Sequence, residues 1–99
     1  IQDNTIFTSF QKNPEPLTTI KPKYPFIAQQ AGIQGRVVVS AFVDKYGIVT
    51  KTQIVESIDT ILDEAAREAV KRTRFSPAQQ GATGNYVGAW ITIPVDFKL

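Results

Sequence analysis

The sequence predicts an α+β domain in which two helices pack on one face of a three-stranded antiparallel sheet. Three stretches carry this prediction. Apolar residues alternate along residues 86–99, as in a strand with one face on a core. Residues 36–57 have the pattern of two strands joined by a glycine turn. Residues 61–74 carry an apolar stripe at helical spacing. A short helix comes first, so the order is helix, strand, strand, helix, strand.

Residues 1–20 are the least regular part of the chain. We expect them to be a linker end or N-terminal extension whose aromatic side chains touch the domain, which itself comprises residues 21–99. The alternative is an extra strand around residues 5–10 that covers a sheet edge. Prolines at positions 14, 16, 22 and 25 predict an extended, stiff connection that excludes helix.

A short helix and a hairpin follow. Proline suits the first helical position and Gly32 is a stop signal, so residues 25–31 predict a helix. Its expected apolar side comprises Phe26, Ile27, Ala28 and Ala31. The strand over residues 36–44 directs alternate apolar residues to one face and leaves Val38 and Phe42 on the other. The turn over residues 44–47 leads to a strand over residues 48–57, with a bulge expected near Lys51 or Thr52.

The long helix is predicted over residues 61–74, with Asp59 as its N-cap. Its apolar stripe comprises Leu62, Ala65, Ala66, Ala69 and Val70. Acidic residues stand in the first turn and Lys71, Arg72 and Arg74 in the last, as the helix dipole favours. We expect Arg67 and Lys71 to pair with Asp63 and Glu64. Phe75 should plug the core, and residues 78–85 form a flexible loop.

The last strand carries the main functional signal. Its odd positions are all apolar: Val87, Ala89, Ile91, Ile93, Val95, Phe97 and Leu99. Pro94 has no N–H, so it predicts an edge strand. If Pro94 faces the open edge, the backbone groups of Tyr86, Gly88, Trp90 and Thr92 face it too. Such a row of free donors and acceptors is either an aggregation hazard or a docking site.

Composition narrows the function classes. The chain has 99 residues, a net charge of +2, no cysteine and no histidine. Disulfides, most zinc sites and histidine-based catalysis are therefore excluded, and we expect no metal or cofactor. No apolar run approaches the roughly 20 residues of a membrane span. Because the chain starts at Ile1 and has no methionine, we expect it to be a fragment or processed product from which a membrane anchor is absent.

Neither catalysis nor nucleic-acid binding gains support from the charged residues. Asp44, Asp59 and Asp63 are explained separately as a turn residue, a cap and a helix-terminal charge, and no base accompanies any serine. We therefore predict that the chain is not an enzyme. The basic face of the long helix is better explained as a solvated face, because acidic residues adjoin it. Trp90 and Phe42 on a sheet leave a small RNA-binding domain as an alternative.

The pattern of residues 21–99 resembles the C-terminal domain of TonB. The matching residues include Pro22-Lys23-Tyr24-Pro25, Gly32-Ile33-Gln34-Gly35-Arg36, Val43-Asp44-Lys45-Tyr46-Gly47, Leu62-Asp63-Glu64-Ala65-Ala66, Phe75-Ser76-Pro77-Ala78 and Pro94-Val95-Asp96-Phe97. The order and spacing of these pieces are specific, although each piece alone is weak. The best-studied members of the family carry glutamine at the position of Lys21, and an aromatic residue is common at the position of Thr73.

The resemblance implies a periplasmic domain of an energy transducer that is anchored in the inner membrane with ExbB and ExbD. Such a domain binds the TonB box of outer-membrane receptors as an added strand and couples proton-motive force to uptake of nutrients such as iron chelates. The implied partner-binding residues are Asn85, Tyr86, Val87, Gly88, Ala89, Trp90, Ile91, Thr92, Ile93, Pro94 and Val95, with Lys21, Pro22 and Lys23 as a second contact. Arg36 and Tyr24 are interpreted as structural.

Two further alternatives stay open at this point. The chain could be a TonB-like interaction module of another envelope protein, used for sensing or scaffolding. It could also form a homodimer through its free sheet edge. The full-length gene separates the transducer from the other envelope proteins, since a membrane span and a Pro-rich linker mark the transducer.

Overall fold

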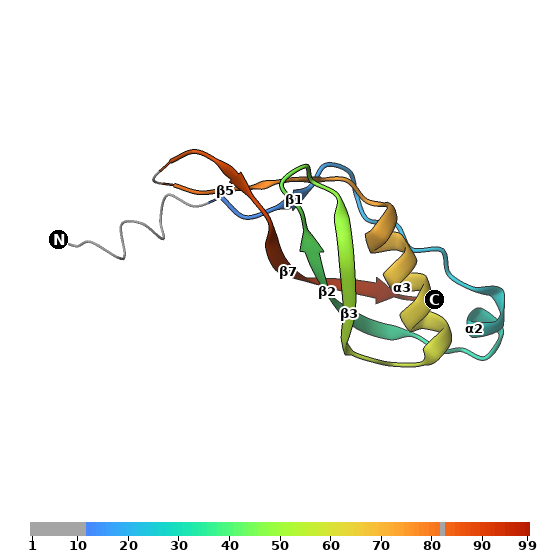
Figure 1. Cartoon of the computed structure of the whole chain (residues 1–99). Helices are drawn as coiled ribbons and strands as arrows, with labels where there is room; N and C mark the ends of the chain where they lie inside the picture. The colour runs from blue at the N-terminus through green and yellow to red at the C-terminus, as the bar shows by residue number, and fades with distance from the viewer. Residues whose placement is uncertain (1–11, 82) are drawn as a thin grey trace.

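The computed structural model describes residues 12–81 and 83–99 and confirms the α+β class (Figure 1). The main sheet contains β2 (Gly35–Val43), β3 (Val49–Glu56) and β7 (Ala89–Phe97). The helices are α2 (Phe26–Gln30) and α3 (Thr60–Arg72). Four short strands complete the chain: β1 (Glu15–Pro16), β4 (Phe75–Ser76), β5 (Ala78–Gln79) and β6 (Tyr86–Val87).

The main sheet is antiparallel in the order β3-β2-β7, so β7 lies at an edge. Its register runs without interruption from Gly35 opposite Phe97 to Val43 opposite Ala89. Between β2 and β3 the register shifts twice, once between Val38 and Val39 and once between Phe42 and Val43. The second shift lies beside Lys51, where the sequence predicts a bulge.

The core lies between this sheet and α3. It is built from alternate residues of β2 and β7, from Phe75, and from the predicted stripe of α3, in which Leu62, Ala66, Ala69 and Val70 are buried. Asp59 caps α3 as predicted, because its carboxylate accepts a hydrogen bond from the N–H of Ile61 at 2.9 Å. The periodicity of the sequence therefore locates both layers of the core.

The C-terminal end of α3 differs from the prediction. The helix ends at Arg72, because Thr73 is extended and its hydroxyl donates to the carbonyl of Ala69 at 2.8 Å. Arg74 therefore lies outside the helix. Among the ion pairs, Arg67 contacts Glu64 at 2.6 Å as predicted, but Lys71 pairs with Glu68 rather than with an acid of the first turn.

Three other predictions about exposed segments are wrong. In α2 only Ala28 is buried, whereas Phe26 and Ile27 are 70% and 67% exposed, because a five-residue helix turns little surface to the core. Val87 and Leu99 are exposed, since β7 spans only Ala89–Phe97. Part of the predicted flexible loop is instead ordered as the ribbon of β5 and β6, which extends away from the main sheet (Figure 1).

The N-terminal segment pairs with the chain that follows α3. Glu15 and Pro16 of β1 lie opposite Ser76 and Phe75 of β4, and Lys12 forms a bridge with Gln79. Residues 12–17 therefore run antiparallel to residues 74–79 (Figure 1). The alternative of an extra strand at residues 5–10 falls outside the described residues.

Candidate docking edge

The outer edge of β7 is the candidate site. Among the described strands, β7 pairs with β2 alone, so its other side carries no strand. Along this stretch Trp90 lies opposite Phe42, Thr92 opposite Ser40, and Pro94 opposite Val38. Ile93 and Val95 are buried, while Trp90, Thr92 and Pro94 are exposed on the other face, as the period of two predicts. The strand thus combines a fixed inner face with an unpaired edge.

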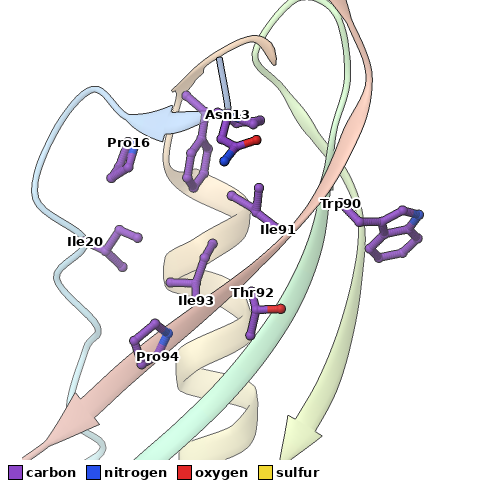
Figure 2. A pocket seen from close by; sticks show the side chains of 10 residues that line it. Asn13, Pro16, Ile20, Trp90, Ile91, Thr92, Ile93 and Pro94 are labelled. Atoms are coloured by element: carbon purple, nitrogen blue, oxygen red, sulfur yellow. The ribbon is translucent and has the colours of Figure 1, made fainter. Parts of the chain in front are cut away.

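A groove runs beside this edge (Figure 2). One side is formed by residues 90–94 and the opposite wall by the N-terminal segment, including Pro14, Pro16 and Ile20, and Phe75 also belongs to the lining. Its volume of about 510 Å³ falls within the roughly 300–1,000 Å³ of ligand sites. In Figure 2, Ile91 and Ile93 point toward this wall, whereas Trp90 points away from it.

Backbone hydrogen bonds hold the wall of the groove. Lys12 and Gln79 exchange two such bonds, each of 3.0 Å, and the N–H of Leu17 donates to the carbonyl of Arg74 at 2.9 Å. The N–H of Glu15 donates to the hydroxyl oxygen of Ser76 at 3.1 Å. Ile20 is half-buried against the core. The segment that faces β7 is therefore fixed at both ends.

The opposite face of the sheet carries an aromatic pair. The rings of Phe42 and Trp90 meet edge to face, with centroids 5.5 Å apart, and Trp90 is 52% exposed. The Lys51 ammonium lies 5.9 Å from the centroid of the Phe42 ring. A side chain at Gly88 would place its Cβ 2.4 Å from the Phe42 ring, so glycine leaves room for this pair.

The groove has an uncharged lining, and the nearest cross-strand ion pair lies further along β7. Arg36 Nε of β2 is 2.6 Å from Asp96 Oδ1 of β7, and both side chains are exposed. The hydrogen bond from Arg36 lowers the pKa of Asp96, and the same bond raises the pKa of Arg36. Tyr24 donates its hydroxyl to the carbonyl of Ile33 and packs edge to face on Phe97. These contacts agree with the structural roles expected for Arg36 and Tyr24.

The structure brings only some of the predicted site residues together. Residues 90–94 line the groove, whereas Tyr86 and Val87 belong to the ribbon with β5. Lys23 lines a separate hollow against α3, so the second predicted contact lies away from the groove. Pro14, Pro16, Ile20 and Phe75 also line the groove, although the sequence pattern does not mark them as site residues. The proline density before residue 21 was the available signal, since it indicates an extended segment.

Two chemical features are absent from the described residues. Residues 12–81 and 83–99 contain no group of three or more possible metal ligands among histidine, cysteine, aspartate and glutamate. Over the same ranges, no helix is long and apolar enough to cross a membrane.

The fold and the site define the class of this protein as an α+β domain with an edge strand beside an uncharged groove. Residues 20–99 match the family model of the Gram-negative bacterial TonB protein C-terminal domain. The chain therefore belongs to the TonB C-terminal domain family, which confirms the resemblance found in the sequence.

Relatives and solved structures agree with this assignment. The chain is 40% identical over 81 residues to Protein TonB of Vibrio cholerae, covering 81% of the chain and 32% of that protein. It is 37% identical over 79 residues to protein tonB2 of Pseudomonas aeruginosa, covering 79% and 28% respectively. The chain thus spans about a third of the length of these relatives.

Two solution NMR structures share the fold. The TonB CTD of Pseudomonas aeruginosa has a TM-score of 0.69 at 32% identity, covering 88% of this chain and 87% of that one. The TonB-CTD of Helicobacter pylori (residues 179–285) has a TM-score of 0.58 at 31% identity, covering 79% and 69%.

Proposed function

We propose that this chain is the receptor-binding domain of a TonB-type energy transducer. In this proposal it lies in the periplasm and is anchored to the inner membrane through a region outside this chain, which also contacts ExbB and ExbD. The domain docks on the TonB box of outer-membrane receptors and so couples proton-motive force to nutrient uptake. Family membership and the position of β7 at the edge of the described sheet support this proposal.

The single observation that carries the proposal is the position of β7 at the sheet edge, with Pro94 opposite Val38. Antiparallel pairs alternate between hydrogen-bonded and non-hydrogen-bonded. Because Pro94 has no N–H, its pair with Val38 suits the non-hydrogen-bonded kind. By the period of two, Trp90 and Thr92 then also direct their backbone N–H and C=O groups away from β2. These groups are the proposed partners of the receptor strand.

Strand addition of this kind gives useful affinity. About six new backbone hydrogen bonds at roughly 1 kcal/mol net each oppose the cost of ordering the peptide. Because most of this energy comes from the main chain, one domain serves several receptors. The proposed contacts are residues 85–95, and Lys21, Pro22 and Lys23 are a second contact for a more distant part of the receptor.

The test is an NMR titration of the isotope-labelled chain with a synthetic TonB-box peptide. We expect the largest shifts at the amides of Gly88, Trp90 and Thr92, with new cross-strand contacts, and smaller shifts at Tyr86, which pairs with Gln79 of β5. Two matched peptides carry N-methyl groups at the odd or at the even residues, so that each lacks the N–H donors along one edge of its backbone. The peptide that is methylated on the edge facing β7 should not bind. Shifts confined to α3, or equal affinity for all peptides, would remove strand addition at β7 from the proposal.

The same edge also supports a homodimer, because a second copy of β7 offers the same row of groups. Sedimentation equilibrium measures this directly. The TonB-box peptide should then shift the dimer toward monomer, since the two partners compete for one edge. A dimer that the peptide leaves unchanged would place its interface elsewhere.

A further inference from the structure

The groove beside β7 has a defined relation to any strand that adds to that edge. An added strand lies about 4.7–4.9 Å from β7 in the sheet, and its side chains alternate between the two faces. On the α3 face they enter the space between Ile91 and Ile93 on one side and Pro16 and Ile20 on the other (Figure 2). On the opposite face they lie beside Trp90 and Thr92, which are exposed.

The two faces differ in chemistry. The groove is lined by Asn13, Pro14, Pro16, Ile20, Phe75 and residues 90–94, and none of these residues is charged. A charged side chain that lost its hydration in this groove would find no oppositely charged residue, so its desolvation would be strongly unfavourable. The face of Trp90 is open to solvent and has Lys51 near its aromatic pair, so polar side chains keep their hydration.

We propose that this groove is a side-chain selectivity site, which requires apolar residues at every second position of the docked strand and leaves the intervening positions free. The inference rests on the proposed docking at β7. It adds a preference for particular peptide side chains, which backbone hydrogen bonds alone do not provide. Its distinguishing residues are Ile20 and Pro16, which belong to the wall and not to the sheet. The ligand class is therefore an extended peptide with alternating aliphatic or aromatic side chains.

The wall is preorganised for this role. Its hydrogen bonds to residues 74–79 and the packing of Ile20 against the core hold it in place through contacts within the domain itself. Groups that are already fixed lose little entropy on binding, so ordering the wall subtracts little from the free energy gained by burying an apolar side chain. Burial of one aliphatic side chain corresponds to a change of about tenfold or more in affinity.

The experiment is a serine scan of the TonB-box peptide against three forms of the 99-residue chain: the unmodified chain, Ile20→Ser and Leu17→Ser. Leu17 is the matched control, because it lies on the same segment, is 65% exposed and is not part of the lining. With the unmodified chain, serine at alternate peptide positions should weaken binding about tenfold or more, with small effects between them.

With the Ile20→Ser chain, the factor by which serine at these alternate peptide positions weakens binding should be smaller by about threefold or more. With the Leu17→Ser chain, this factor should be unchanged. Pro16→Ser, at an exposed residue, provides a second groove variant should Ile20→Ser fail to fold. Equal losses in the groove variants and in Leu17→Ser would overturn the selectivity site while binding at β7 itself stands. Absence of any peptide binding at β7 would instead overturn the docking proposal, and the selectivity site with it.

Discussion

The contact between Gly47 and Phe75 gives the sharpest test of how the fold supports the groove. Gly47 lies in the turn between β2 and β3, is buried and has φ +83°. Its carbonyl accepts a hydrogen bond from the N–H of Phe75 at 3.0 Å. A Cβ at this position would lie 2.0 Å from the carbonyl oxygen of Phe75, which is a backbone atom and cannot rotate away.

These contacts set the magnitude for Gly47→Ala. An L-residue in the left-handed region costs about 1–2 kcal/mol. Forcing the turn away from Phe75 adds an overpacking cost of about 1–3 kcal/mol and weakens a hydrogen bond of about 1 kcal/mol. We expect a total loss of about 3–6 kcal/mol, a large part of the roughly 5–15 kcal/mol that stabilises a small domain.

Gly32→Ala is the matched control. Gly32 has φ +70°, but a Cβ there would meet no atom within 4 Å. Gly32→Ala should therefore lower the free energy of unfolding only through the strained backbone conformation. The expected loss is about 1 kcal/mol once the lower entropy of the unfolded alanine chain is included. The difference between the two variants isolates the clash with Phe75.

Urea unfolding followed by the fluorescence of Trp90, the single tryptophan, measures both variants. If the free energies of unfolding of Gly47→Ala and Gly32→Ala differ by less than about 1 kcal/mol, the argument from the Phe75 contact is wrong. A Gly47→Ala chain that folds should also lose affinity for a TonB-box peptide, because Phe75 lines the groove.

Three further perturbations test the ion pair, the helix cap and the core. The hydrogen bond from Arg36 lowers the pKa of Asp96, so the pair stabilises the fold fully above the usual carboxyl pKa, and this stabilisation is lost as the pH falls through the lowered pKa of Asp96. In Asp96→Asn, the urea midpoint should therefore fall less steeply as the solution is acidified. A pH profile identical to that of the unmodified chain would contradict this. In thermal unfolding, Asp59→Ala should lower the free energy of unfolding by about 1 kcal/mol and Asp59→Asn by much less, because the asparagine side-chain oxygen can still accept the hydrogen bond from Ile61. Equal losses in the two variants would show that Asp59 does not cap α3. In urea unfolding, Leu62→Ala should lower the free energy of unfolding by about 2–5 kcal/mol, because Leu62 is fully buried. The control Val55→Ala, at an exposed residue, should lower it by less than about 1 kcal/mol. Similar losses in the two variants would show that Leu62 is not part of the core.

The parts of the fold that could be predicted are those with local periodicity. Alternation over residues 89–97 locates the core face of β7, and the spacing from Leu62 to Val70 locates that of α3. These patterns repeat within a few residues, so a single stretch of sequence displays them. The edge position of β7 was also predictable, because Pro94 excludes a central strand.

The wall of the groove could not be predicted in the same way. β1 and β4 have two residues each, which is too short for any period to emerge, and the contact between Glu15 and Ser76 spans 61 positions. The break between β6 and β7 at Gly88 has a similar origin, since the Phe42 ring that occupies the space above Gly88 comes from another strand. Pairings of this kind depend on tertiary contacts, so the prolines indicate an extended segment but no local pattern shows which strand it lies beside.

Pro14 and Pro16 have a consequence for competition at the edge of β7. A segment tethered beside a free strand acts as an internal competitor at an effective concentration in the millimolar range, which would outcompete a guest of moderate affinity. These two residues face β7 across the groove, and neither has an N–H to offer it. Nearby, the N–H groups of Lys12 and Leu17 donate to the carbonyls of Gln79 and Arg74, and that of Glu15 donates to the hydroxyl of Ser76. Among the described residues, this segment thus lies beside the sheet without pairing with β7, and a fourth strand position stays available there.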